Sequence, residues 1–183
     1  MKNLYLFLLL ISVSFFSINA QEKIEEESDA TKEETIEFIT NYVNAEGYRA
    51  VQITKKRTYL TGKAKINIKD GIIDLDFIEP KGEYSGDGFK ESYRFSLEDL
   101  SKVQFYFGDF ESKSGGISEF NGIQINCYNA RNCIFHFDKD KGIYVEKDRL
   151  ISIDFVNKST AERLVKAFNH LIKLSGGGKE SKF

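Results

Sequence analysis

Short runs in which apolar and polar residues alternate fill the chain from residue 48 to residue 156. A period of two places every second side chain on one face of a strand, so each run predicts a strand with one apolar face. Between two of the runs stands Asp70-Gly71, which is typical of a tight β-hairpin turn. We expect seven or eight antiparallel strands, in a sheet that curls or closes to bury its apolar face. The apolar positions are Val51 and Ile53; Ile66 and Ile68; Ile73, Leu75 and Phe77; Tyr93 and Phe95; Val103, Phe105 and Phe107; Ile123, Ile125 and Cys127; Cys133, Phe135 and Phe137; and Ile151, Ile153 and Phe155.

Apolar residues at helical spacing lie on both sides of this strand region. The first helix is expected over residues 32–46, where Thr31 and Glu34 form a capping box at the start and Gly47 marks the end. A second helix is expected over residues 159–174. Its apolar stripe consists of Ala161, Leu164, Val165, Phe168, Leu171 and Ile172.

The second helix has its own start and stop signals. Ser159 and Glu162 have the spacing of a capping box, and Gly176 follows the last apolar residue. Together these elements predict one α+β domain over residues 31–175, in which the C-terminal helix closes a curled sheet or barrel. We expect large phenylalanines to fill its core: Phe77, Phe95, Phe105, Phe107, Phe135, Phe137, Phe155 and Phe168.

The first 20 residues have the three-part layout of a secretion signal. Lys2 supplies a positive charge, an apolar run extends over residues 4–16, and a polar close ends at Ala20. A membrane anchor is the alternative interpretation, but a spanning helix needs about 20 apolar residues and this run is shorter. We therefore expect residues 1–20 to be a signal peptide that is removed on export to the periplasm or the extracellular space.

The segments that flank the predicted domain are polar. Residues 21–30 are acidic and poor in apolar side chains, which is typical of a disordered leader, and residues 176–183 predict a flexible tail. The whole chain has 26 basic and 28 acidic residues, and removing the signal takes away one lysine, which leaves 25 against 28 and a net charge of −3. We therefore expect no nucleic-acid partner. The rest of the chain has no second apolar stretch of spanning length, so we also expect no stable membrane insertion after signal cleavage.

Cys127 and Cys133 are the only cysteines in the chain. An exported protein meets an oxidising environment, in which such a pair usually closes. Both cysteines are in phase with apolar neighbours, so we expect them on adjacent strands of one hairpin, close enough for a disulfide. The alternatives are two free buried thiols and a redox-active pair. A reactive pair is disfavoured because the spacing is not C-x-x-C and an apolar face does not stabilise a thiolate.

Few residues in the sequence are suited to acid–base or metal chemistry. His136 and His170 are the only histidines; we expect His136, with Asp138 on the same strand face, to be solvent-exposed, and His170 to be structural. Asp74 and Asp76 share a strand face at a separation of about 7 Å, which some acid–base pairs also have, but such alternation is common on solvated strands. We expect no catalytic residues, no metal site and no cofactor.

The order of elements over residues 48–175 resembles the pleckstrin-homology-like barrel, in which one C-terminal helix closes an end of a bent antiparallel sheet. The closing stretch AERLVKAFNHLIKLSGG resembles the end of a group of small, uncharacterised exported bacterial proteins with this layout. The helix at 32–46 departs from the plain barrel. Phosphoinositide binding, which the resemblance implies for some intracellular members, is not expected here, because the basic residues near a loop are only Lys55, Lys56 and Arg57.

The function that we expect is that of an exported binding or structural module without enzymatic activity. The preferred hypothesis is that it binds another envelope protein through a strand edge or the helix at 32–46, because small barrels are usually filled by their own side chains. A first alternative is a carrier that holds a small apolar ligand in the barrel. A second is an envelope hydrolase with a carboxylate site that uses Asp74, Asp76 or His136.

Overall fold

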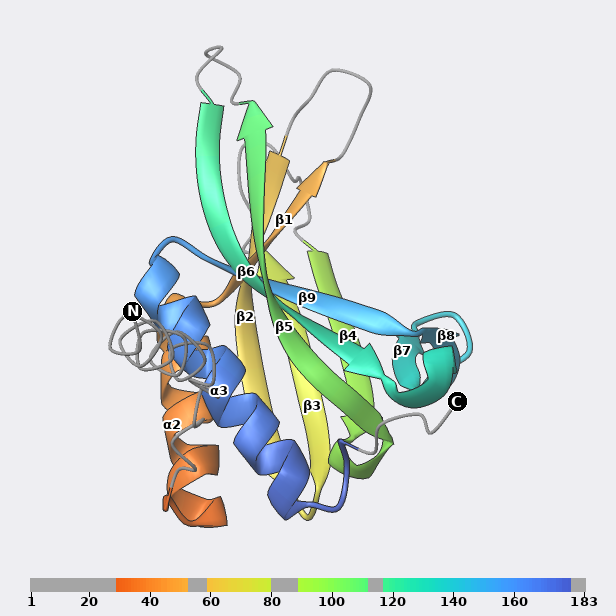
Figure 1. Cartoon of the computed structure of the whole chain (residues 1–183). Coiled ribbons are helices and arrows are strands. Elements are labelled where there is room, and N and C mark those ends of the chain that lie inside the picture. Colours follow the sequence, from red (N-terminus) through yellow and green to blue (C-terminus); the bar gives the residue numbers. More distant parts are fainter. Residues whose placement is uncertain (1–28, 53–58, 80–88, 112–116, 179–183) are drawn as a thin grey trace, which may run out of the picture.

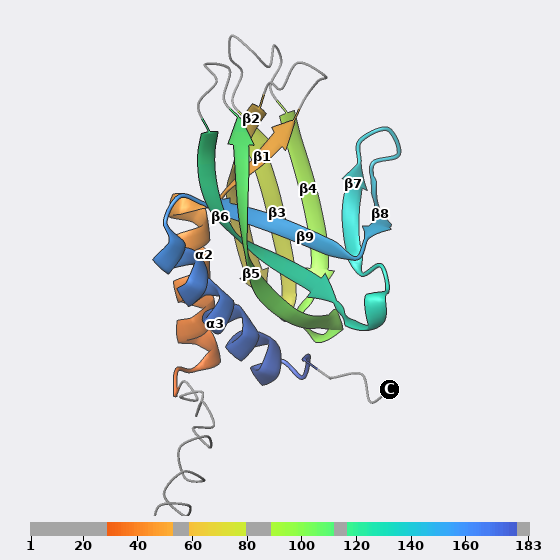
Figure 2. The same cartoon turned by 45° about the horizontal axis from the view of Figure 1, so that its top comes forward.

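The computed structural model describes residues 29–52, 59–79, 89–111 and 117–178. Within these ranges the chain has an α+β fold, in which nine antiparallel strands form one sheet that is curled into a half barrel (Figure 1). Two helices lie beside each other on one side of the sheet (Figure 2). The predicted signal peptide, and most of the predicted leader and tail, lie outside the described residues.

The described elements follow one another in a simple order. They are α2 (Lys32–Glu46), β1 (Tyr48–Gln52), β2 (Tyr59–Lys69), β3 (Ile72–Glu79), β4 (Phe89–Ser96), the short 3-10 helix η1 (Leu97–Asp99), β5 (Leu100–Glu111), β6 (Ile117–Cys127), a second 3-10 helix η2 (Tyr128–Ala130), β7 (Ile134–Asp138), β8 (Ile143–Asp148), β9 (Leu150–Phe155) and α3 (Lys158–Leu174).

The strands lie in the order β5-β6-β9-β1-β2-β3-β4-β7-β8, and every neighbouring pair is antiparallel, as expected. The expected count of seven or eight strands is too low. One missed strand is β8, which is the last strand at one edge of the sheet and carries Glu146, Lys147 and Asp148. An edge strand that is partly exposed on both faces does not need the apolar alternation that reveals a strand in a sequence.

The predicted hairpin turn at Asp70-Gly71 is confirmed. Both residues have positive φ angles, 52° and 79°, which is the backbone conformation that a type I′ turn requires. The turn sets the register of β2 and β3, in which Ile68 lies opposite Ile73. Their apolar side chains therefore share the buried face of the sheet.

The start of α2 is the predicted capping box. The Thr31 hydroxyl accepts from the backbone N–H of Glu34 at 3.2 Å, and the Glu34 carboxylate accepts from the backbone N–H of Thr31 at 2.8 Å. The pKa of Glu34 is lowered by the bond from the backbone N–H of Thr31 and by a further bond that the Thr31 hydroxyl donates to the same carboxylate at 2.9 Å. Gly47 ends the helix with an N–H bond to the carbonyl of Val43.

The capping box predicted at the start of α3 is wrong. The N-cap is Asn157, whose side-chain oxygen accepts from the backbone N–H of Ser159, so Ser159 lies inside the helix. Asparagine caps helices at least as well as serine, and it starts this helix one residue earlier than expected. The predicted apolar stripe is buried at Leu164, Phe168 and Leu171.

Two asparagines on the helices replace missing strand neighbours. On α2, the Asn44 amide accepts from the backbone N–H of Ile66 at 2.7 Å and donates to its carbonyl at 3.3 Å. On α3, Asn169 makes the same pair of bonds to Val103, at 2.8 and 2.9 Å. Val103 lies on the edge strand β5, and Ile66 lies beyond Lys63, where the pairing of β2 with β1 ends. The two amides therefore satisfy backbone groups that the sheet leaves open, and they fix both helices to it.

We expect Asn169→Leu to lower the free energy of unfolding by about 1–3 kcal/mol, because it leaves a partly buried N–H and C=O of Val103 without partners. The measurement is urea unfolding followed by circular dichroism. The matched control is Lys166→Leu, on the exposed side of the same helix. A loss for Asn169→Leu no larger than that of the control would contradict this role.

The core lies between the sheet and the two helices, and four of the eight phenylalanines expected there are fully buried: Phe77, Phe95, Phe155 and Phe168. Phe105 is partly buried and packs against them. The expectation is wrong for Phe107, which is 58% exposed. The ring of Phe105 already faces Lys158 at the start of α3, so Phe107, two residues further along β5, has no helix over it.

The expectation is also wrong for Phe135, which is 38% exposed, and Phe137 is only half-buried. The alternation along β7 was predicted in the wrong phase. Ile134 is fully buried, so Ile134 and His136 point inward and Phe135 points outward.

Cys127 and Cys133 form a disulfide, with their Cα atoms 5.8 Å apart. The expected hairpin between them is wrong, because β6 pairs with β5 and β9, whereas β7 pairs with β4 and β8. The bridge instead spans η2. The backbone N–H groups of Cys127 and Cys133 donate to the carbonyls of Arg149 and Asp148, at 2.9 and 3.2 Å. The disulfide-bonded cysteines and these two hydrogen bonds therefore connect the segment between β6 and β7 to the corner between β8 and β9.

Candidate functional site

A polar cluster interrupts the apolar inner face of the sheet. Arg49 on β1 lies opposite the buried Gly62 of β2, which is in phase with the core residue Ala64, so its side chain points inward. Its guanidinium carbon lies 5.3 Å from the ring centre of Phe77 and 5.6 Å from that of Tyr93. Two aromatic rings therefore support this cation, in contacts that cation–π attraction stabilises.

Tyr93 on β4 is the centre of the cluster. Its hydroxyl accepts from Nη1 of Arg49 at 2.7 Å and donates to Oε2 of Glu91 at 2.9 Å. The same Nη1 also donates to Oε2 of Glu91 at 2.7 Å. Burial raises the pKa of Tyr93 to about 12; Arg49 acts against the rise and Glu91 adds to it. The phenol therefore stays protonated at neutral pH and holds Arg49 and Glu91 together.

Arg49 stays charged in this environment. Burial alone lowers the pKa of its guanidinium, but Tyr93, Glu91 and Asp148 together more than offset this, so the pKa is raised. About a third of each side chain of the Arg49–Glu91 pair is exposed, 33% and 35%. The ion pair thus lies at the boundary between the core and solvent, where water can reach one side of the guanidinium.

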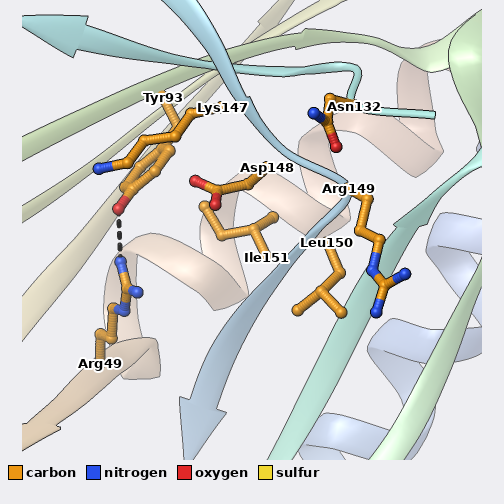
Figure 3. Close-up of a pocket in the computed structure, with 8 residues that line it drawn as sticks. All are labelled: Arg49, Tyr93, Asn132, Lys147, Asp148, Arg149, Leu150 and Ile151. Carbon is orange, nitrogen blue, oxygen red and sulfur yellow. Dashed lines mark hydrogen bonds between the residues drawn. The ribbon is translucent and has the colours of Figure 1, made fainter. Parts of the chain in front are cut away.

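A cleft of about 520 Å³ opens beside this cluster, and its size is within the range of ligand pockets. Arg49 and Tyr93 lie on one side of it, opposite residues of the corner between β8 and β9 (Figure 3). The lining residues are Arg49, Tyr93, Asn132, Lys147, Asp148, Arg149, Leu150 and Ile151. The lining carries three cations and one carboxylate, and its exposed apolar side chain is that of Leu150.

The corner that forms the second wall is held in place by the disulfide region. Arg149 is the single residue between β8 and β9, and its carbonyl accepts from Cys127. The carbonyl of Asp148 accepts from Cys133. These bonds leave the side chains of Lys147, Arg149 and Leu150 exposed beside the cleft.

The expectation that His136 is solvent-exposed is wrong. His136 is half-buried directly opposite Tyr93 in the pairing of β4 and β7, and their ring centres lie 5.0 Å apart. It does not pair with Asp138. The Asp138 carboxylate instead accepts from the backbone N–H groups of Asp140 and Lys141, and the bond from Lys141 is the largest cause that lowers its pKa.

The other sequence candidates lie away from the cleft. Asp74 and Asp76 are in ion pairs on the outer face of the sheet, with Arg94 at 2.7 Å and Lys90 at 2.9 Å. His170 on α3 contacts the carbonyl of Ala30 at 2.8 Å, which links the start of α2 to α3. The structure thus does not bring the two aspartates and the histidines together.

A second cleft, of about 690 Å³, lies on the other side of Asn132. Its lining carries Glu98, Asp99 and Glu146 as well as Arg131, and it reaches the end of α3 at Ser175. The side-chain oxygen of Ser175 is buried there without a hydrogen-bond partner. Asn132 borders both clefts, so the two meet at the start of β7.

Among the described residues, no helix is both long and apolar enough to cross a membrane. No group of three or more histidine, cysteine, aspartate or glutamate side chains in this part of the chain could hold a metal ion.

Comparison with known proteins gave no relatives: no family model, no curated protein and no solved structure matches the chain. The candidate site therefore rests on its own geometry.

Sequence reasoning missed the Arg49 cluster, although a signal for it was present. Arg49 is in phase with Val51 and Ile53, the positions expected to face inward, and Glu91 is in phase with Tyr93. A charged residue at an inward position is costly unless it has partners or a function. What the sequence could not show is that β1 and β4, which are not neighbours in the sheet, bring these side chains together.

The raised pKa of Tyr93 makes stability depend on pH above 10. The phenol loses its proton near pH 10 in the unfolded chain but at about 12 in the fold, so the unfolded state binds fewer protons in between and stability falls as pH rises. We expect Tyr93→Phe to reduce this fall, measured as urea unfolding midpoints between pH 9 and 11. An equally steep decline in Tyr93→Phe would contradict the account of the cluster.

Proposed function

We propose that the chain is an exported, non-enzymatic binding module that holds a segment of an envelope protein in the cleft between Arg49 and the β8–β9 corner. The observation that carries this proposal is the lining of the cleft. The exposed apolar side chain of Leu150 lies beside three cations, one carboxylate and the amide of Asn132. Such a mixture suits a peptide segment, which presents apolar and polar groups within a short distance of each other.

Export is supported by the layout of residues 1–20 and is compatible with the disulfide. Disulfides persist in oxidising compartments, and this one joins side chains that are only 5% and 8% exposed. The resemblance to pleckstrin-homology-like barrels and to exported bacterial proteins stays a prediction.

A carrier of an apolar small molecule is the less favoured function. Such a carrier needs an empty apolar interior, but the space between the sheet and the helices is occupied by fully buried side chains, Phe77, Phe95, Phe155 and Phe168 among them. Four of the eight residues that line the cleft are charged. A peptide therefore fits the described surface better than a lipid-like molecule does.

The test is selection of random peptides displayed on phage against the exported chain. We expect enriched peptides to bind with micromolar Kd, and Leu150→Glu, in the cleft, to weaken them at least tenfold. The control is Val156→Glu. Val156 is 79% exposed and does not line the cleft, so this variant should bind as the wild type does.

Two results would contradict the proposed function. One is that no peptide is enriched, or that the enriched peptides bind Leu150→Glu as well as the wild type. The other is stoichiometric binding of a fluorescent fatty-acid probe that the peptides do not displace, which would support the carrier instead.

A further inference from the structure

Arg49 has hydrogen-bonding capacity that the fold does not use. A guanidinium has five N–H donors on three nitrogens. In the part of the chain that the structure describes, its hydrogen bonds to Glu91 and Tyr93 both start from Nη1. Nε and Nη2 have no partner there, while the guanidinium lines the cleft (Figure 3).

The surroundings of Arg49 strengthen its electrostatic attraction for an anion. Phe77 and Tyr93 support the guanidinium and exclude water from one side, so a charge that binds on the other side is less screened than in bulk water. Lys147 and Arg149 add two exposed cations at the rim. Neither of them forms an ion pair with any described residue, so both can draw an anion towards the cleft.

On these observations, and resting on the proposed function, we infer that the cleft binds the carboxylate of an acidic side chain of the partner protein, through the free donors of Arg49. The geometry of a guanidinium suits two parallel hydrogen bonds to one carboxylate. An apolar neighbour of that carboxylate in the partner would pack on Leu150, which is 39% exposed.

The charges around Arg49 favour a single negative charge on the ligand. Glu91 already pairs with Arg49, and Asp148 lies in the lining close enough to influence its pKa. With the three cations of the lining, Arg49, Lys147 and Arg149, these two carboxylates leave one net positive charge, which one carboxylate neutralises and a doubly charged phosphate exceeds. A carboxylate is therefore the preferred group, although a guanidinium binds both.

Arg94 provides a matched control within the same sheet. Like Arg49, it pairs with a carboxylate, Asp74, at 2.7 Å, and its guanidinium lies over an aromatic ring, that of Tyr144, at 4.6 Å. It follows Tyr93 in β4 and so projects from the opposite face, outside the cleft. Replacing Arg94 therefore removes an equivalent ion pair and cation–π contact but leaves the cleft unchanged.

The experiment is an NMR titration of the exported chain with two peptides, acetyl-Leu-Glu-amide and acetyl-Leu-Gln-amide. We expect the Glu peptide to bind at least tenfold more tightly and to shift the side-chain N–H signals of Arg49. Arg49→Gln should remove the difference between the peptides. Arg94→Gln should keep it.

A second variant tests the site in case Arg49→Gln does not fold. Lys147 and Arg149 are exposed, so the double change Lys147→Gln with Arg149→Gln leaves the core intact. We expect it to weaken the Glu peptide severalfold and to reduce the salt dependence of its binding, with no change for the Gln peptide.

The outcomes separate the two proposals. Equal binding of both peptides, abolished by Leu150→Glu, would overturn the carboxylate inference and leave the proposed function standing. Binding of neither peptide, together with a failed phage selection, would overturn both. Tighter binding of inorganic phosphate than of the Glu peptide at the Arg49 signals would overturn the choice of a carboxylate.

Discussion

Covering one apolar face of a nine-stranded sheet is the constraint on which this fold depends. Two helices do the covering, and they pack mainly on β2, β5, β6 and β9. Apolar burial alone would let them slide, because it has no direction. Asn44 and Asn169 remove that freedom, since each amide matches the backbone N–H and C=O of one strand residue. The helices are therefore fixed at two points on the sheet, and the area that they cover is fixed with them.

The polar cluster lies on strands that the helices contact little. Arg49, Tyr93 and Lys147 come from β1, β4 and β8, and the curl of the sheet brings them to one cleft. A cation and a carboxylate at inward positions cost desolvation that an apolar pair would avoid. Arg49 and Glu91 occupy inward positions that apolar core residues could occupy. Such exceptions to apolar patterning are concentrated at functional sites. This is the physical reason to place function at Arg49 and not at the ion pairs of the outer face.

The sequence was informative at several places where local chemistry decides the outcome, although the capping box at Ser159 is an exception. The capping box at Thr31, the turn at Asp70-Gly71 and the antiparallel pairing follow from short patterns, and the structure has them all. The pairing of strands that are distant in the sequence could not be predicted from such short patterns. The partners of β7, and hence the phase of His136 and the surroundings of the disulfide, depend on strands distant in the sequence. The candidate site was the part that the sequence predicted least well, because Arg49 and Tyr93 lie on strands that are separated by two other strands in the sheet.

We interpret the Arg49 cluster as a binding feature that the fold does not require. The most direct test is the free energy of unfolding of the triple variant Arg49→Met, Glu91→Met and Tyr93→Phe, which replaces the ion pair by apolar side chains of similar length and removes the hydroxyl that would lose both partners. We expect a stability equal to or above that of the wild type, since such replacements are often neutral or stabilising. A loss of about 3 kcal/mol or more, as when a buried pair is broken, would show that the cluster holds the sheet together and would contradict the claim.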